Sequence, residues 1–113
     1  MRVLILTNNI LTERDIQFKL QILGHEVYVS NSVLNNYLSK GIDETINLFD
    51  LCIISKTVNN LETKILATEL AKFNTKILRE VENINFPKSD EKVDLYGYVS
   101  NEQSIAELRE SII

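Results

Sequence analysis

Two short polar segments carry the residue types with which this sequence could do chemistry. The segment 7–9 (Thr-Asn-Asn) follows the apolar run 3–6, and the segment 55–57 (Ser-Lys-Thr) follows the apolar run 51–54. Hydroxyl and amide groups can hold a small polar ligand, a serine can accept a phosphoryl group, and a lysine can pair with an anion. The same side chains also cap strand ends by bonding to nearby backbone. Both interpretations stay open from these residues alone.

Other chemistry is absent from the sequence. It contains no glycine-rich phosphate loop, no Ser-His-Asp set and no zinc-ligand spacing. The single cysteine, Cys52, excludes an internal disulfide and sits in an apolar run, which predicts a small buried side chain. His25 has no Cys or His nearby in sequence, so we expect a loop residue and not a metal ligand. The sequence thus predicts no metal and no cofactor.

Length and composition bound the class of protein. The 113 residues suit a single domain spanning 1–113, and 44% hydrophobic with 25% charged residues is ordinary for a globular protein. The chain has 12 Lys and Arg residues against 16 Asp and Glu residues, and this net charge of −4 does not support binding to the phosphate backbone of nucleic acid. The chain shows no secretory leader and no apolar stretch of membrane-spanning length. We therefore expect a cytoplasmic protein with no membrane partner.

The elements that must position the two polar segments alternate along the chain. Continuous apolar or β-rich runs predict five strands, at 3–6, 26–30, 50–54, 76–78 and 95–99. Helical spacing predicts four helices: from Glu13 to Gly24, from about Ser32 to Gly41 with Asn31 or Ser32 as its cap, from Leu61 to Phe73, and from Ser100 to the end. A further helical turn is expected within 42–48, and 81–94 is expected to be mostly loop.

Two capping boxes are predicted at helix starts. Thr12 with Asp15 precedes the first helix, and Ser100 with Gln103 precedes the last one. Short strand–helix alternation implies parallel βαβ units, hence an α/β three-layer sandwich with a flavodoxin-like strand order 2-1-3-4-5. In such sheets the functional crevice lies beyond the carboxyl ends of the first and third strands. We therefore expect segments 7–9 and 55–57 to meet there.

Three local patterns carry a family resemblance. They are the opening run 2–6 (Arg-Val-Leu-Ile-Leu), the run 49–54 (Phe-Asp-Leu-Cys-Ile-Ile), and Tyr98 followed by 105–108 (Ile-Ala-Glu-Leu). In this order and spacing, the chain resembles the receiver domain of bacterial two-component response regulators over nearly its whole length. The resemblance implies a CheY-like fold. Since 81–94 covers the place of the receiver's fourth helix, we expect that helix to be short or irregular.

The resemblance also shows which receiver groups are missing. Working receivers use an acidic pair to bind Mg²⁺, an aspartate to accept the phosphoryl group, and a lysine to pair with it. On this chain the acidic pair falls on Thr7 and Asn8, the acceptor on Ser55 and the lysine on Asn101. These four residues form a degenerate receiver pocket, so the resemblance implies a pseudo-receiver without catalytic residues, metal or cofactor.

The remaining receiver positions leave alternatives. The strand-four Ser/Thr falls on Arg79 or Glu80, and Lys56 could replace the lost cation or be a solvated loop residue. Tyr98 matches the aromatic that receivers rotate on activation, so it marks a possible signalling surface, with a half-buried strand tyrosine as the alternative.

The sequence supports two functional hypotheses. The first is a phosphorylation-independent pseudo-receiver: a non-enzymatic protein-interaction or dimerisation domain of an atypical response regulator, acting in signal transduction and transcription regulation. It would be the N-terminal part of a longer regulator, with a homodimer or protein partner, and DNA would be bound only by a separate domain. The alternative is a flavodoxin-like small-ligand-binding or enzymatic domain.

Overall fold

The chain forms one parallel sheet. The structure is a computed structural model, and it describes residues 1–83 and 97–112. In this part of the chain, five parallel strands lie in the order β2-β1-β3-β4-β5, as predicted. The strands are β1 (Arg2–Leu6), β2 (Glu26–Ser30), β3 (Leu51–Ile54), β4 (Lys76–Glu80) and β5 (Gly97–Val99).

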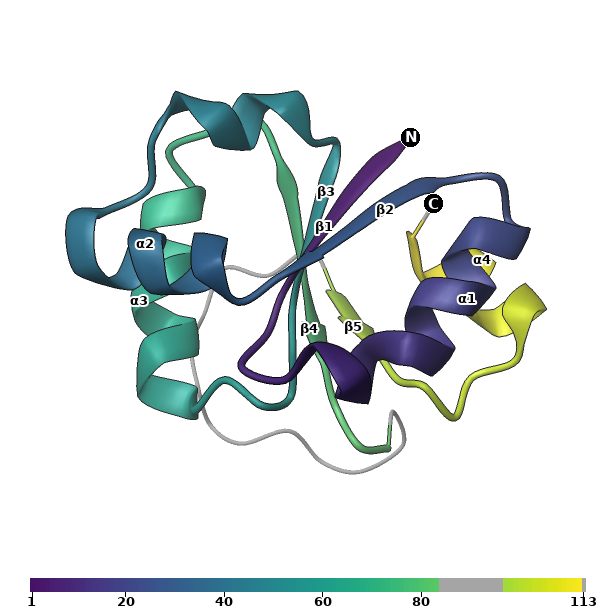
Figure 1. Cartoon of the computed structure of the whole chain (residues 1–113). Helices are drawn as coiled ribbons and strands as arrows, with labels where there is room; N and C mark the ends of the chain where they lie inside the picture. The colour runs from purple at the N-terminus through teal and green to yellow at the C-terminus, as the bar shows by residue number, and fades with distance from the viewer. Residues whose placement is uncertain (84–96, 113) are drawn as a thin grey trace.

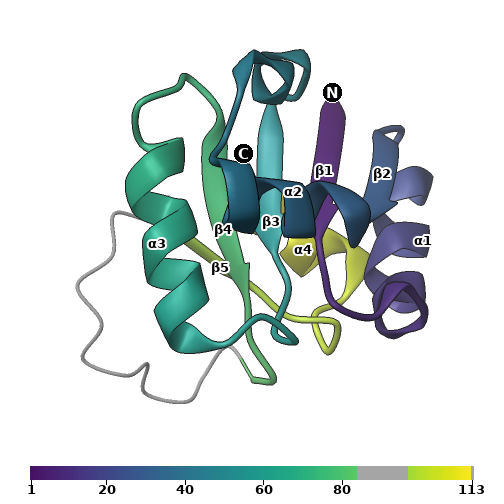
Figure 2. The ribbon, with the colours of Figure 1, turned by 60° about the vertical axis from the view of Figure 1, so that its left-hand side comes forward.

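Helices cover both faces of the sheet (Figures 1 and 2). On one face lie α1 (Arg14–Ile22) and α4 (Ile105–Ile112), and on the other lie α2 (Ser32–Lys40) and α3 (Asn60–Leu70). Two 3₁₀ segments precede α1 and β3, namely η1 (Ile10–Glu13) and η2 (Glu44–Leu48). The arrangement confirms the predicted three-layer α/β sandwich.

The central strands account for two hydrophobic cores. Leu4 of β1 and Ile54 of β3 pack toward α2 and α3, whereas Ile5 and Ile53 pack toward α1 and α4. All four side chains are fully buried, because successive strand residues point to opposite faces and both faces are covered. Each such side chain stabilises the fold by about 1.5–3 kcal/mol, which fixes the strand ends where the polar segments begin.

The predicted capping boxes differ from those in the structure. The Asn9 side chain caps η1 by accepting a hydrogen bond from the backbone N–H of Leu11, at 3.1 Å. The prediction of a Thr12–Asp15 box was wrong, because the chain makes a 3₁₀ turn before α1 and Thr12 lies inside that turn.

The last helix also begins later than predicted. Gln103 Oε1 accepts from the backbone N–H of Ser100 at 3.0 Å, but this local bond lies in the turn before α4. The reciprocal box at the start of α4 is Ser104 with Glu107, whose two bonds measure 3.0 and 3.1 Å. The Ser100–Gln103 pair therefore organises the loop between β5 and α4 and does not cap the helix.

Two further boundaries changed. Helix α3 ends at Leu70 and not at Phe73, while β4 continues two residues past the predicted end, to Glu80. The longer strand places Arg79 and Glu80 inside the sheet. The expected short or irregular fourth helix and the first residues of the fifth strand fall in 84–96, outside the described residues.

Helix α2 lacks the cap that was expected. Asn31 holds the N-cap position without a side-chain bond, and the Ser30 hydroxyl accepts from the backbone N–H of Val33 at 3.0 Å. Gly41 follows the helix with φ +88°, a conformation that suits glycine after a helix end.

Candidate functional site

The two polar segments meet at the carboxyl edge of the sheet. Thr57 Oγ1 lies 3.1 Å from Thr7 Oγ1 and 2.9 Å from Ser55 Oγ. The backbone N–H of Asn8 donates to Thr57 Oγ1 at 3.0 Å, and the Asn8 amide donates to the Thr57 carbonyl oxygen at 2.9 Å. The sheet therefore brings Thr7, Asn8 and Ser55 together, with Thr57 as the link between them.

A buried carboxylate, Glu13, fills the centre of this hydroxyl cluster. It is the last residue of η1, and its Oε2 atom accepts from Ser55 Oγ at 2.9 Å and from Thr7 Oγ1 at 3.0 Å. Glu13, Thr7 and Ser55 are all 0% exposed. Sequence reasoning missed Glu13 as a pocket residue, because one acid at the start of a predicted helix is favoured there by the helix dipole alone.

A second carboxyl group, that of Glu80, adjoins Glu13 from the end of β4. Glu80 is 1% exposed, and its Oε1 accepts from the backbone N–H of Lys56 at 3.2 Å. Burial first, and then the hydrogen bond and the charge of Glu13, raise the pKa of Glu80 to about 7, with the N–H and charge of Lys56 partly opposing the rise. Of the two positions predicted to match the strand-four Ser/Thr, Arg79 and Glu80, the second therefore carries an acid whose proton is held near neutral pH.

The cations near the site are engaged elsewhere. The buried guanidinium of Arg79 donates to the carbonyl oxygens of Ser55 and, at 2.7 Å, of Val58. The Lys56 ammonium lies 3.5 Å from a carboxylate oxygen of Glu82. Arg79 thus holds the turn after β3 from inside, and Lys56 forms an ion pair at the surface.

The other two predicted residues lie apart from the cluster. Among the described residues, Asn101 makes no hydrogen bond to Thr7, Asn8 or Ser55, and its backbone carbonyl accepts from Lys19 Nζ at 2.6 Å. Tyr98 is half-buried on β5, in register with Arg79 of β4. The degenerate pocket is therefore formed by the ends of β1, β3 and β4 with η1.

The residues present do not fit the magnesium ion that the receiver resemblance implies. Magnesium requires octahedral oxygen coordination and usually keeps several waters, which need space and open carboxylates. Here Glu13 Oε2 already accepts from two hydroxyls, and the side chains around it are sealed from solvent. Within residues 1–83 and 97–112, no three Asp, Glu, His or Cys side chains are grouped to hold a metal.

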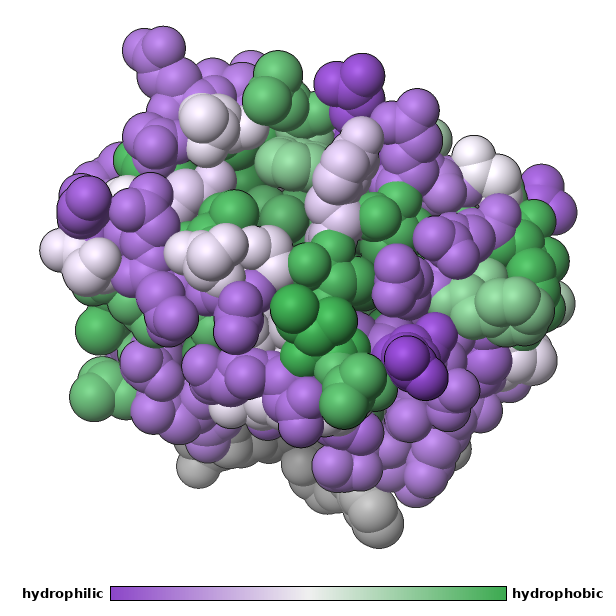
Figure 3. Space-filling model, in the orientation of Figure 1, coloured by the Kyte–Doolittle hydropathy of each residue, from purple (hydrophilic) through white to green (hydrophobic). Residues whose placement is uncertain are grey.

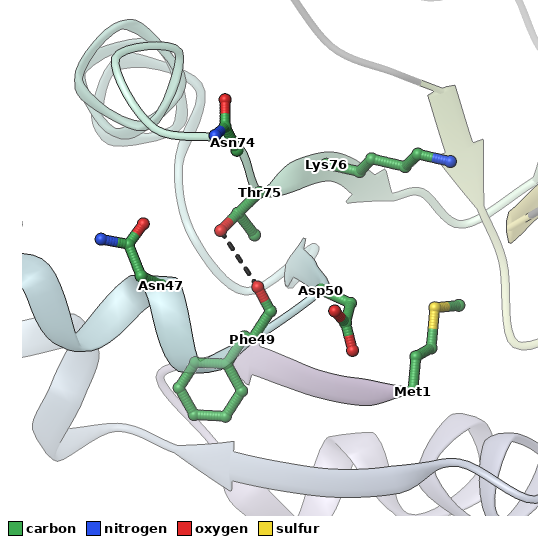
Figure 4. A pocket seen from close by; sticks show the side chains of 7 residues that line it. All are labelled: Met1, Asn47, Phe49, Asp50, Asn74, Thr75 and Lys76. Carbon is green, nitrogen blue, oxygen red and sulfur yellow. Dashed lines mark hydrogen bonds between the residues drawn. The ribbon is translucent and has the colours of Figure 1, made fainter.

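A separate hollow of about 540 Å³ opens at the opposite edge of the sheet (Figure 4). It lies between Met1, the segment 47–50 and the segment 74–76. Thr75 donates to the Phe49 carbonyl oxygen at 3.1 Å, and an Asp50 carboxylate oxygen accepts from the backbone N–H of Arg2 at 2.9 Å. Ligands of open α/β sheets bind at the carboxyl ends of the strands, so this hollow at their amino ends is not the candidate site.

No protein-family model matches the chain, and no curated protein matches it. Solved structures do. The N-terminal domain of a response regulator/sensory box/GGDEF three-domain protein from Carboxydothermus hydrogenoformans gives a TM-score of 0.71 at 17% identity, covering 99% of this chain and 90% of that one. The chain has the CheY-like receiver fold.

Two further structures illustrate the range of proteins with this receiver fold. An orphan response regulator from H. pylori gives a TM-score of 0.66 at 18% identity and covers 100% of this chain and 97% of its own. The receiver domain of a sensor histidine kinase from Pseudomonas aeruginosa has magnesium in its active-site cleft. It gives a TM-score of 0.68 at 14% identity, covering 96% of this chain and 91% of that one. At these identities the likeness establishes the fold.

No helix within residues 1–83 and 97–112 is both long enough and apolar enough to cross a membrane.

Proposed function

We propose that this chain is a phosphorylation-independent pseudo-receiver, the regulatory protein-interaction domain of an atypical response regulator. The observation that carries the proposal is the Glu13 carboxylate, which accepts from both Thr7 and Ser55 inside the crevice. In this proposal the domain is not an enzyme. Residues 1–113 form a single domain at the N-terminal part of a longer regulator, and transcription regulation and DNA binding require a separate domain.

The chemistry of the crevice supports independence from phosphorylation. Phosphoryl transfer requires an accessible acceptor oxygen and a cation that offsets the charge on the phosphoryl group. Ser55 is 0% exposed and its hydroxyl donates to Glu13, so an incoming phosphoryl group would meet a buried carboxylate of like charge. This arrangement also does not favour the alternative of a small-ligand site in the same crevice.

An exposed apolar surface supports a role in protein contact. Leu11, Phe18 and Ile22 lie on η1 and α1 and are 66%, 63% and 52% exposed. Their spacing puts Phe18 and Ile22 one turn apart on the same side of α1. Figure 3 shows apolar side chains at the surface near η1 and, separated from them by hydrophilic residues, at the edge of the molecule where α1 lies. Large exposed apolar groups of this kind mark interaction surfaces, and a second copy of the chain is the partner that we propose for it.

A titration with beryllofluoride and Mg²⁺ tests the phosphorylation claim. Followed by amide NMR, the titration should leave the signals of Ser55 and Tyr98 unchanged at millimolar reagent. A receiver with all four charged groups, treated in parallel, should respond and so validates the reagent. Saturable shifts at Ser55 and Tyr98 would overturn the proposal.

Sedimentation velocity tests the contact surface. We expect a reversible dimer, and a Phe18→Lys substitution should weaken it by roughly tenfold or more, since one buried phenyl ring contributes about 2 kcal/mol. The matched control is Leu61→Lys on α3, where an apolar side chain is 70% exposed on the other face of the sheet. A strict monomer at high concentration, or equal effects of both substitutions, would contradict this surface.

A further inference from the structure

Glu13 and Glu80 form a buried acid pair with unusual hydrogen bonding. Glu13 Oε1 and Glu80 Oε2 are both enclosed, and no other described residue donates to either of them, so a hydrogen bond between them requires that one of the two carboxyl groups carries a proton. Their other carboxyl oxygens are satisfied, Glu13 Oε2 by Ser55 and Thr7 and Glu80 Oε1 by the N–H of Lys56. A buried carboxylate oxygen without a donor costs several kcal/mol, so this arrangement requires a proton or a cation between the two groups.

No neighbouring cation meets that need. Lys56 of the turn after β3 is the cation whose charge acts on Glu80, and its ammonium pairs with Glu82. The Arg79 guanidinium donates to carbonyl oxygens of the same turn. No ion pair between residues of the described part of the chain includes Glu13 or Glu80. Two ionised carboxylates would therefore repel one another in a poorly solvated place.

We propose that Glu13 and Glu80 share a single proton, and that losing this proton opens the carboxyl edge of the sheet, so that the domain responds to pH. This inference goes beyond the proposed function, because it assigns the pseudo-receiver a switch of its own. The proton joins η1 to β4 across the end of β3. When it leaves, the two carboxylates repel one another and Glu80 moves away from Glu13; because Glu80 Oε1 holds the N–H of Lys56, the turn 55–57 shifts with it.

The environment of Glu80 places the response in an accessible range. Burial first, and then the hydrogen bond and charge of Glu13, raise the pKa of Glu80 to about 7. Paired carboxyl groups that share a proton behave in this way, one of them titrating far above its ordinary value. A change of one pH unit around neutrality would therefore change severalfold the fraction of molecules in which the pair holds its proton.

Carbon-detected NMR of the side-chain carboxyl groups in the full chain tests the proposal directly. We expect the Glu80 carboxyl to titrate at about pH 7, and the amides of Lys56 and Thr57 to shift with the same midpoint. In a Glu80→Gln variant these amide shifts should disappear near neutrality, while the surface control Glu82→Gln should keep them. The proposal is overturned if both carboxyl groups of the pair are ionised by about pH 5.

Two further measurements distinguish a shared proton from other causes. A Glu13→Gln substitution removes one charge and should lower the titration midpoint of Glu80; an unchanged midpoint would mean that the pair does not share its proton. Addition of millimolar MgCl₂ to the unmodified chain should leave the midpoint in place. If adding Mg²⁺ lowers the titration midpoint of Glu80 by one pH unit or more, the pair binds a cation and the proposal is refuted.

Discussion

Replacing Glu80 by glutamine should remove a pH-dependent part of the stability of this domain. The pKa of Glu80 is raised from the ordinary 4.5 to about 7, mainly by burial. Each pKa unit corresponds to 1.36 kcal/mol, so the difference between the pKa of Glu80 in the folded state and in the unfolded state corresponds to about 3 kcal/mol. This is a large fraction of the net stability of a small domain.

The sign follows from where the proton is held more tightly. The folded state binds it more tightly than the unfolded chain, so the contribution is fully present below about pH 4.5 and is lost as the pH rises through about 7. A glutamine at this position carries no charge, and its amide can donate to the free oxygen of Glu13. We therefore expect Glu80→Gln to be nearly neutral at about pH 5 and stabilising by about 2–3 kcal/mol at about pH 8.

Urea denaturation followed by circular dichroism, at several pH values between about 5 and 8, measures this difference. Other groups titrate alike in the two proteins, so they cancel in the comparison. Glu82→Gln serves as the matched control, because its carboxylate is exposed and pairs only with Lys56 among the described residues. A stability difference between Glu80→Gln and the unmodified chain that stays constant with pH would refute the reasoning.

Three other predictions concern single side chains. Arg79→Met removes the charged donor of the Ser55 and Val58 carbonyl oxygens, which keep only the bonds from the Val58 N–H and the Thr63 hydroxyl, and should cost about 3 kcal/mol in urea denaturation. Arg109→Met on the exposed side of α4 should cost little. Ser104→Ala removes a helix cap and should lower the unfolding free energy by about 1 kcal/mol, while Ser39→Ala, which lacks such a role, should change it by less than about 0.5 kcal/mol; equal losses would contradict the capping assignment. Burial raises the pKa of the Cys52 thiol to about 12, so a maleimide at about pH 8 should label it only when urea unfolds the chain, and rapid labelling of the folded protein would contradict its burial.

The sheet could be predicted from the sequence because its central strands are buried on both faces. Val3 to Leu6 and Leu51 to Ile54 are unbroken apolar runs, a pattern that few other elements produce. Once two such runs are separated by helical segments, parallel pairing and the right-handed crossover leave few alternative orders. The meeting of segments 7–9 and 55–57 follows from that order alone.

The acid pair could not be predicted, because its partners come together only in three dimensions. Arg79 and Glu80 are charged, so sequence reasoning ended the fourth strand at Leu78. They are buried because Arg79 finds carbonyl oxygens in the turn after β3 and Glu80 finds Glu13. The periodicity of apolar residues cannot show that a buried charged group finds such a partner, since Glu13 and Glu80 are 67 positions apart in the sequence. The 3₁₀ turn that directs Glu13 inward also has no distinct sequence pattern.

The hydrogen bond from Ser55 to Glu13 limits how phosphotransfer could be rebuilt in this protein. A Ser55→Asp substitution alone would set a third carboxylate beside two that are already buried, without a cation to balance them. The expected result is a destabilised domain that still cannot accept a phosphoryl group. Glu13 must therefore be replaced before Ser55, and only then can acids at positions 7 and 8 gather a metal ion.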